Sequence, residues 1–205
     1  MRSVLAAVSM LAAFTVAASA ETRSVGPFNA VEARGRFRVE VIQGPTRLVE
    51  ITGPDAQRVA ARVHGDELVL SPVDRNWFGP EPEINAVVHV TVTALESLQA
   101  SRGAEIEARD VHAGQFNADA SMGGVLRVSG GCARLEAAAS MGGQIDAGAL
   151  NCTDVRADAS MGGSMRVTAR NAIEAHASMG GVVAVSGEPS RRETHSIMGG
   201  EVSFN

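Results

Sequence analysis

The stretch Ser121-Met122-Gly123-Gly124-Val125-Leu126-Arg127-Val128 decides the fold, because its first four residues return along the chain at a nearly constant interval. Ser-Met-Gly-Gly occurs again at residues 140–143, 160–163 and 178–181. A fifth copy at residues 196–200 carries an inserted Ile197, and residues 101–103 form an earlier, degenerate copy. Successive methionines of the repeat lie 19, 20, 18 and 19 residues apart. A repeat of this length is too short for a helical hairpin and is typical of one coil of a parallel β-helix.

The residues around each copy alternate between apolar and polar side chains, which predicts strands. After the two glycines, the second and fourth residues are apolar in every copy, beginning with Leu126 and Val128. Before the serine, a bulky residue and two alanines alternate with polar residues, beginning with Phe116, Ala118 and Ala120. We expect these apolar side chains to face inward and to stack about 4.8 Å apart from coil to coil. The sequence therefore predicts an all-β fold, a parallel β-helix or β-solenoid.

The four residues of the signature have structural roles in this interpretation. The two glycines are expected at a corner where φ is positive or where a side chain would clash. We interpret the methionine as a stacked filler of the core and the serine as a ladder along the turns. A ligand-binding motif is the alternative, and it has less support because a regular turn accounts for the same residues.

The two cysteines provide a test of the register between coils. Cys132 lies nine residues before Met141, and Cys152 lies nine residues before Met161, so the two are expected side by side in neighbouring coils. The spacing of coils falls within the roughly 4.4–6.8 Å between Cα atoms that a disulfide allows. We predict a Cys132–Cys152 disulfide, with two free thiols as the alternative. A catalytic thiol is not expected, because no histidine shares or flanks this ladder.

Residues 1–20 have the three parts of a secretory signal peptide. Arg2 is the positive charge, an apolar run covers residues 4–16, and Ala18-Ser19-Ala20 is a cleavage site of small residues. The run is shorter than the roughly 20 apolar residues of a membrane-spanning helix. We therefore expect cleavage before Glu21, export to the periplasm or the cell surface, and no stable membrane insertion.

A single domain is expected at residues 21–205. Its regular coils cover residues 101–205, whereas residues 28–100 are rich in strands but less regular. The irregular half is expected to begin the stack and to cover its first coil, because an open first coil would expose unpaired strand edges. At the other end of the chain, Phe204 is placed to plug the open core.

The composition argues against several classes of partner. The formal net charge is −5, and every basic residue is an arginine, with no basic stripe among them. This argues against nucleic acids and against anionic membrane surfaces. Aromatic residues make up only 3% of the chain, which leaves few platforms for stacking sugars or bases.

Two groups of residues are candidates for binding. Trp77 and Phe78 lie in a proline-rich loop at residues 72–82, which is either a binding loop or a cover for the end or flank of the coils. A second group could hold a divalent metal such as zinc, with a solvated polar face as the alternative, and consists of Glu174, His176, Glu193 and His195. If the inserted Ile197 falls within a strand, His195 leaves this column. No catalytic residues and no cofactor are predicted.

The chain resembles the head GIN domain family of auto-transporter adhesins over residues 28–205. The matching segments are Phe28-Asn29-Ala30-Val31, residues 35–44, residues 65–70 and the junction from Leu95 through Ser101 to Ala104, followed by the Ser-x-Gly repeats. The resemblance implies a right-handed β-helix in an exported bacterial protein. It implies adhesion as the function and supplies no catalytic residues.

We therefore expect a non-catalytic envelope or cell-surface protein, an adhesin or binding module that presents the faces of its β-helix to a protein or glycan. A periplasmic structural or scaffold module is the alternative. An enzyme acting on polysaccharide is the third hypothesis, and the lack of a catalytic cluster and of an aromatic groove argues against it. The oligomeric state stays open.

Overall fold

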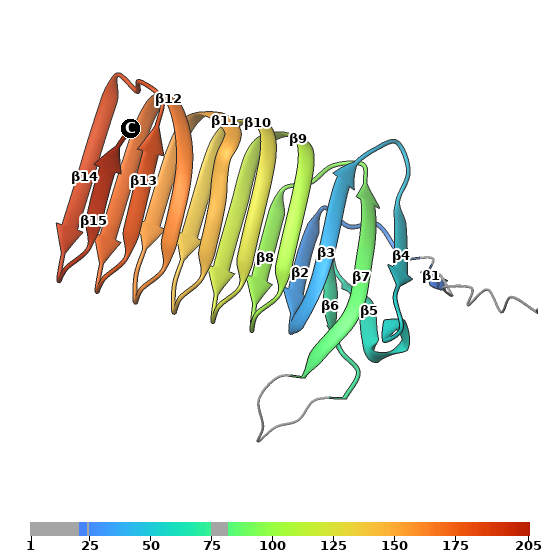
Figure 1. The fold of residues 1–205 in the computed structure, drawn as a ribbon. Coiled ribbons are helices and arrows are strands. Elements are labelled where there is room, and N and C mark those ends of the chain that lie inside the picture. The colour runs from blue at the N-terminus through green and yellow to red at the C-terminus, as the bar shows by residue number, and fades with distance from the viewer. Residues whose placement is uncertain (1–20, 24, 75–81) are drawn as a thin grey trace, which may run out of the picture.

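The computed structural model describes residues 21–23, 25–74 and 82–205, and this part of the chain is almost entirely strand (Figure 1). The only helical element in it is the short 3-10 helix η1 (Ala56–Arg58). The strands are β1 (Glu21–Arg23), β2 (Ala30–Arg34), β3 (Arg36–Gln43), β4 (Leu48–Thr52), β5 (Val59–His64), β6 (Glu67–Pro72), β7 (Glu83–Val92), β8 (Ser97–Ser101), β9 (Glu105–Ser121), β10 (Val125–Ala139), β11 (Gln144–Ala159), β12 (Ser164–Ser178), β13 (Val182–Ser186), β14 (Arg191–Ile197) and β15 (Glu201–Phe204).

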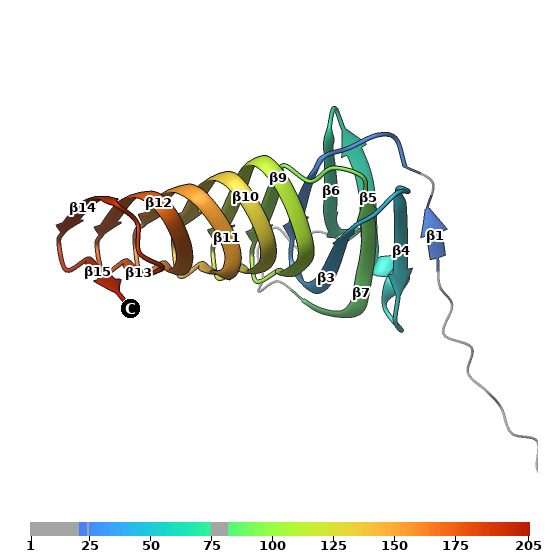
Figure 2. The ribbon, with the colours of Figure 1, turned by 90° about the horizontal axis from the view of Figure 1, so that it is seen from above.

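The regular half is a β-solenoid, as the repeat predicted. Each of the long strands β9 to β12 leaves one turn, bends around the coil and reaches the next turn, as the view in Figure 2 shows. Neighbouring coils pair in parallel and in register, so that Leu126 lies opposite Ile145, which lies opposite Met165 of the following coil. The stack ends with β13, β14 and β15, which continue the same parallel pairing.

Two faces of the solenoid follow from this pairing. The first face contains β6, β2 and β8, then the C-terminal parts of β9 to β12, and finally β14. The second face contains β7 and β3, then the N-terminal parts of β9 to β12, and finally β13 and β15. Both faces therefore extend along the whole stack.

The core consists of inward columns of identical or similar side chains. Phe116, Leu135, Val155 and Ile173 form one column, and all four are buried. Two flanking columns consist of alanine, which keeps the interior narrow enough for one bulky residue per strand. This arrangement confirms the alternation predicted from the sequence.

The irregular half begins the stack and covers it, as predicted. β2 and β3 form a coil-like pair that joins β8 and β9 in parallel. β6 and β7 pair in parallel with β2 and β3, and beyond them the pairing becomes antiparallel, with β5 against β6 on the first face and β4 against β7 on the second. β1 pairs with β4 at this end, whereas the C-terminus lies at the opposite end of the stack (Figure 1).

Each signature forms a tight turn with two residues at positive φ. In the first copy, Gly124 donates its N–H to the carbonyl of Ser121 at 2.9 Å, and Met122 and Gly123 between them have φ of 48° and 75°. Two positive φ angles are the property of a type I′ turn. Gly124 is required for a different reason, because a Cβ there would lie 2.2 Å from the carbonyl oxygen of Ala100 in the preceding coil.

The prediction that the methionines fill the core is wrong. The exposed fractions of the five methionines range from 46% to 77%, at Met122, Met141, Met161, Met179 and Met198. The physical reason is the turn itself, because its first central residue projects away from the coil and interrupts the alternation of the strands. Among the described residues, the methionine that does lie in the core is Met165, which belongs to a strand.

The interpretation of Ile197 as an insertion is also wrong. Ile197 lies opposite Ser178 and occupies the first position of the last turn, where Gly200 donates to its carbonyl at 3.0 Å. Ser196 instead lies opposite Ala177, at a position that faces inward in the other coils. No residue is inserted, so His195 keeps its place opposite His176.

Candidate binding surfaces

The outward columns of the first face carry charged groups that could contact a partner. One column runs through Asn117, Glu136, Arg156, Glu174 and Glu193 on successive coils. Arg156 bonds to Glu174 in the next coil at 2.7 Å and to Asp158 in its own strand at 3.2 Å. Glu136, Arg156 and Glu174 alternate in sign, which favours contact between their coils at the surface, whereas Glu174 and Glu193 carry the same charge.

The four residues predicted as a patch lie together on β12 and β14. The imidazole rings of His176 and His195 are stacked, with centroids 4.9 Å apart and planes within 9° of parallel. Each ring contacts the glutamate two residues before it, with 2.9 Å from His176 Nε2 to Glu174 Oε1 and 3.3 Å from His195 Nε2 to Glu193 Oε1. The hydrogen bond from His176, together with the charge of Arg156, lowers the pKa of the Glu174 carboxyl.

The contacts of these four residues form a hydrogen-bonded ladder on the surface. Among the described residues, no three His, Cys, Asp or Glu side chains are placed to hold a metal ion. The register predicted from the sequence thus brings the four residues together, and each histidine contacts the glutamate of its own strand.

A charged groove of about 460 Å³ lies beside this patch on the first face. Its lining includes Arg134, Arg156, Glu174, Arg191 and Glu193. Cationic and anionic groups both line it, so the groove offers paired donors and acceptors to a polar partner rather than a site for one sign of charge.

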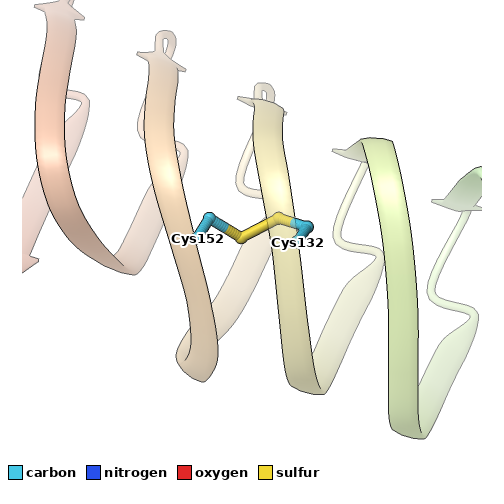
Figure 3. The surroundings of a disulfide bond; sticks show 2 residues. All are labelled: Cys132 and Cys152. Carbon is cyan, nitrogen blue, oxygen red and sulfur yellow. A yellow bond between two sulfur atoms is a disulfide. The ribbon is translucent and has the colours of Figure 1, made fainter.

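The predicted disulfide is present. Cys132 on β10 and Cys152 on β11 lie directly opposite each other, with 4.5 Å between their Cα atoms, and their sulfur atoms are bonded (Figure 3). The bond joins two neighbouring coils, and the chain contains no other cysteine. Such a bond fits an oxidising, extracytoplasmic compartment.

A row of exposed methionines is a surface that the sequence interpretation missed. We call it the methionine row, and it consists of Met122, Met141, Met161, Met179 and Met198. All five occupy the same turn position, with φ between 47° and 49°. The signal was available in the sequence, because a residue followed by glycine in a two-residue turn projects outward, as Asn-Gly does in hairpins.

Trp77 and Phe78, predicted as a binding loop, lie outside the described residues. In the part of the chain that is described, no helix is long and apolar enough to cross a membrane.

Comparison with known proteins gives consistent results for family and fold. The family model described as putative auto-transporter adhesin, head GIN domain, matches residues 27–189. Among solved structures, the chain is similar to a putative adhesin from Bacteroides fragilis with a TM-score of 0.72 and 16% identity, covering 93% of this chain and 98% of that one. A putative adhesin from Parabacteroides merdae matches with a TM-score of 0.58 and 16% identity, covering 91% and 95%.

No curated protein matches the chain. The structural similarities, at 16% identity, concern the fold alone. The family match covers most of the chain, including the irregular half, its junction with the coils and all four Ser-Met-Gly-Gly turns. The chain therefore belongs to the head GIN domain family of putative auto-transporter adhesins.

Proposed function

We propose that the protein is an exported, non-catalytic adhesin of the cell envelope that presents the faces of its solenoid to a protein or glycan partner. The observation that carries this proposal is the register of the outward columns, which places a side chain at the same position of every coil. The coils repeat about every 4.8 Å, so that many weak contacts can be made at once.

Two further observations support the proposal. The family model is described as a putative auto-transporter adhesin, and the two solved structures of the same fold cited above are named putative adhesins. The Cys132–Cys152 disulfide is of the kind that persists in oxidising compartments outside the cytoplasm. The mixed charges of the first face suit a polar partner.

Localisation is the first test. Intact and permeabilised cells are treated with protease and with an antibody against the protein. We expect cleavage and labelling on intact cells. Labelling that appears only after permeabilisation would contradict the adhesin proposal and would leave a periplasmic scaffold or binding module.

Binding to glycan and matrix-protein arrays is the second test, made with variants of each face. The triple variant Arg156→Gln, Glu174→Gln, Glu193→Gln removes three of the four charges in the outward column of the first face and leaves Glu136. A matched control, Asp146→Asn with Arg166→Gln, removes an ion pair of 3.4 Å on the second face. We expect the first variant to lose binding and the control to keep it. Equal binding by both variants would exclude the charged column as the contact surface.

A further inference from the structure

The methionine row holds its side chains next to one another from coil to coil. The N–H of Gly123 donates to the carbonyl of Met141 at 3.2 Å. The same bond joins Gly142 to Met161 at 3.3 Å and Gly162 to Met179 at 3.2 Å. These bonds fix the turns of neighbouring coils directly against each other. Five thioether side chains therefore emerge in a line along one edge of the solenoid.

The fold does not require methionine at this position. Arg102 occupies the equivalent position of the preceding turn, with φ of 56°, and Ala104 closes that turn by donating to Ser101 at 3.2 Å. A left-handed conformation is unfavourable for residues other than glycine, and asparagine and aspartate tolerate it better than methionine does. Neither packing nor backbone geometry therefore accounts for five methionines here.

Duplication of one coil could explain five identical methionines only if other exposed positions had also stayed identical from coil to coil. They have not. One outward column of the first face reads Asp119, Ala138, Asp158, His176, His195. An exposed column of the second face reads Arg127, Asp146, Arg166, Ala184, Ser203. The columns that remain uniform are those with steric demands, such as the inward alanines and the glycine at Gly124 and its equivalents. The methionine row is uniform and yet exposed.

We propose that the methionine row binds soft monovalent metal ions, Cu(I) or Ag(I), through thioether sulfur atoms from successive coils. Thioether sulfur is a soft ligand that selects Cu(I) over hard cations such as Mg²⁺ and Ca²⁺. It is uncharged and does not titrate, so a site built from it does not depend on the protonation of its ligands.

The spacing of the coils suits such a site. Metal–sulfur bonds are about 2.3 Å long in protein zinc sites, and a similar length would place two sulfur atoms on one ion roughly 4 Å apart. This is close to the separation of about 4.8 Å between neighbouring strands. The three rotatable bonds of each methionine side chain allow the sulfur atoms to close the difference. Two or three successive methionines can therefore converge on a single ion.

Cysteine does not compete for the ion. Both cysteines of the chain are joined in the disulfide, so no thiol is available. Silver is the better probe, because Ag(I) needs no reductant that would also reduce this bond.

The test is titration of the purified protein with Ag(I), followed by calorimetry and by NMR of the methionine ε-methyl groups. The variant Met141→Leu with Met179→Leu leaves no two neighbouring thioethers in the row and keeps apolar side chains of similar size. The control, Met165→Leu, changes the core methionine, which is 4% exposed. We expect wild type and control to bind equally and the double variant to bind at least about tenfold more weakly, since even outer-shell changes cost metal sites 10–100-fold.

The NMR spectra identify the ligands directly. Ag(I) should shift the methyl signals of Met141 and Met161 and leave that of Met165 in place. A second variant, His176→Gln with His195→Gln, should bind Ag(I) as wild type does. The proposal is overturned if wild type does not bind, if the leucine variant binds with unchanged affinity, or if binding disappears with the histidines instead. Unchanged Ag(I) binding by the leucine variant would mean that the row acts only as an apolar surface.

Discussion

The guanidinium carbon of Arg192 lies 4.7 Å from the ring centroid of Phe204, at the C-terminal end of the stack. Both residues continue inward columns, with Arg192 opposite Ile173 and Phe204 opposite Val185. Thr194 likewise takes the place of an inward alanine. The last coil thus has polar groups where the internal coils have a core, which suits a coil whose outer side meets water.

Replacing Arg192 by alanine should loosen this end of the stack. A cation–π contact at a partly exposed site contributes about 0.5–1 kcal/mol, and the stem of Arg192 also covers the ring. We expect faster hydrogen exchange in β15 and unchanged exchange in β10. Arg191→Ala is the control on the same strand, and β15 should be unaffected by it. Equal exchange in wild type and Arg192→Ala would mean that Phe204 is held by its strand alone.

The inward columns were predictable from sequence because each coil meets nearly identical neighbours. A period of two then determines which side chains face inward, as for Leu126 and Val128. The same period could not tell parallel from antiparallel pairing, since both present alternate side chains to the core. The antiparallel partners β4 and β5 therefore became visible only in the structure.

Turns were harder to predict because alternation does not continue through them. The exposed position of Met122 follows from two successive positive φ angles, which a strand pattern does not contain. Aligning Ser196 with the serines of the earlier turns made Ile197 look like an insertion. Aligning the glycines that end each turn gives the observed pairing, in which Ile197 lies opposite Ser178. The spacing predicted that His176 and His195 would be neighbours. It could not predict that each ring contacts the glutamate two residues before it, because that contact depends on the side-chain conformations.

Removing the disulfide should lower stability without changing the fold. The bridge closes a sequence separation of 20 residues, for which loop-closure entropy gives about 3 kcal/mol. Cys132→Ala with Cys152→Ala is suitable, because Ala113 and Ala169 already occupy this column in the flanking coils. Urea unfolding should show the loss, and wild type treated with a reductant should fall to the level of the variant. A reductant should have no effect on the variant itself.

Acid should weaken the ladder at Glu174. The pKa of this carboxyl is lowered in the folded state, so its contribution to stability is present above the usual glutamate pKa of about 4.3. That contribution is lost as the pH falls through the lowered value. The melting temperature of wild type should therefore fall more steeply below about pH 4 than that of Glu174→Gln. Glu136→Gln, in the same column but without an ion pair to any described residue, should follow wild type. Parallel curves for all three proteins would contradict the role of this pair.

Adjacent glycines of one turn should respond very differently to alanine. Gly162 has φ of 74° with nothing within 4 Å of an added Cβ, so Gly162→Ala carries only the cost of a left-handed alanine, about 1–2 kcal/mol. Gly163 has an ordinary φ, but its Cβ would lie 2.2 Å from the carbonyl oxygen of Ala139 in the preceding coil. Because backbone atoms cannot yield as a flexible side chain does, Gly163→Ala should cost about 3 kcal/mol or more.

Thermal and urea unfolding of the two single variants measure this difference directly. The disulfide between the coils remains in both variants, so their unfolded states carry the same cross-link and their free energies of unfolding can be compared directly. A larger loss for Gly162→Ala than for Gly163→Ala would mean that the conformation of the turn, rather than the close approach of neighbouring coils, accounts for the paired glycines. The predicted order instead assigns the first glycine to the turn and the second to the contact between coils, which explains why every Ser-Met-Gly-Gly copy keeps both.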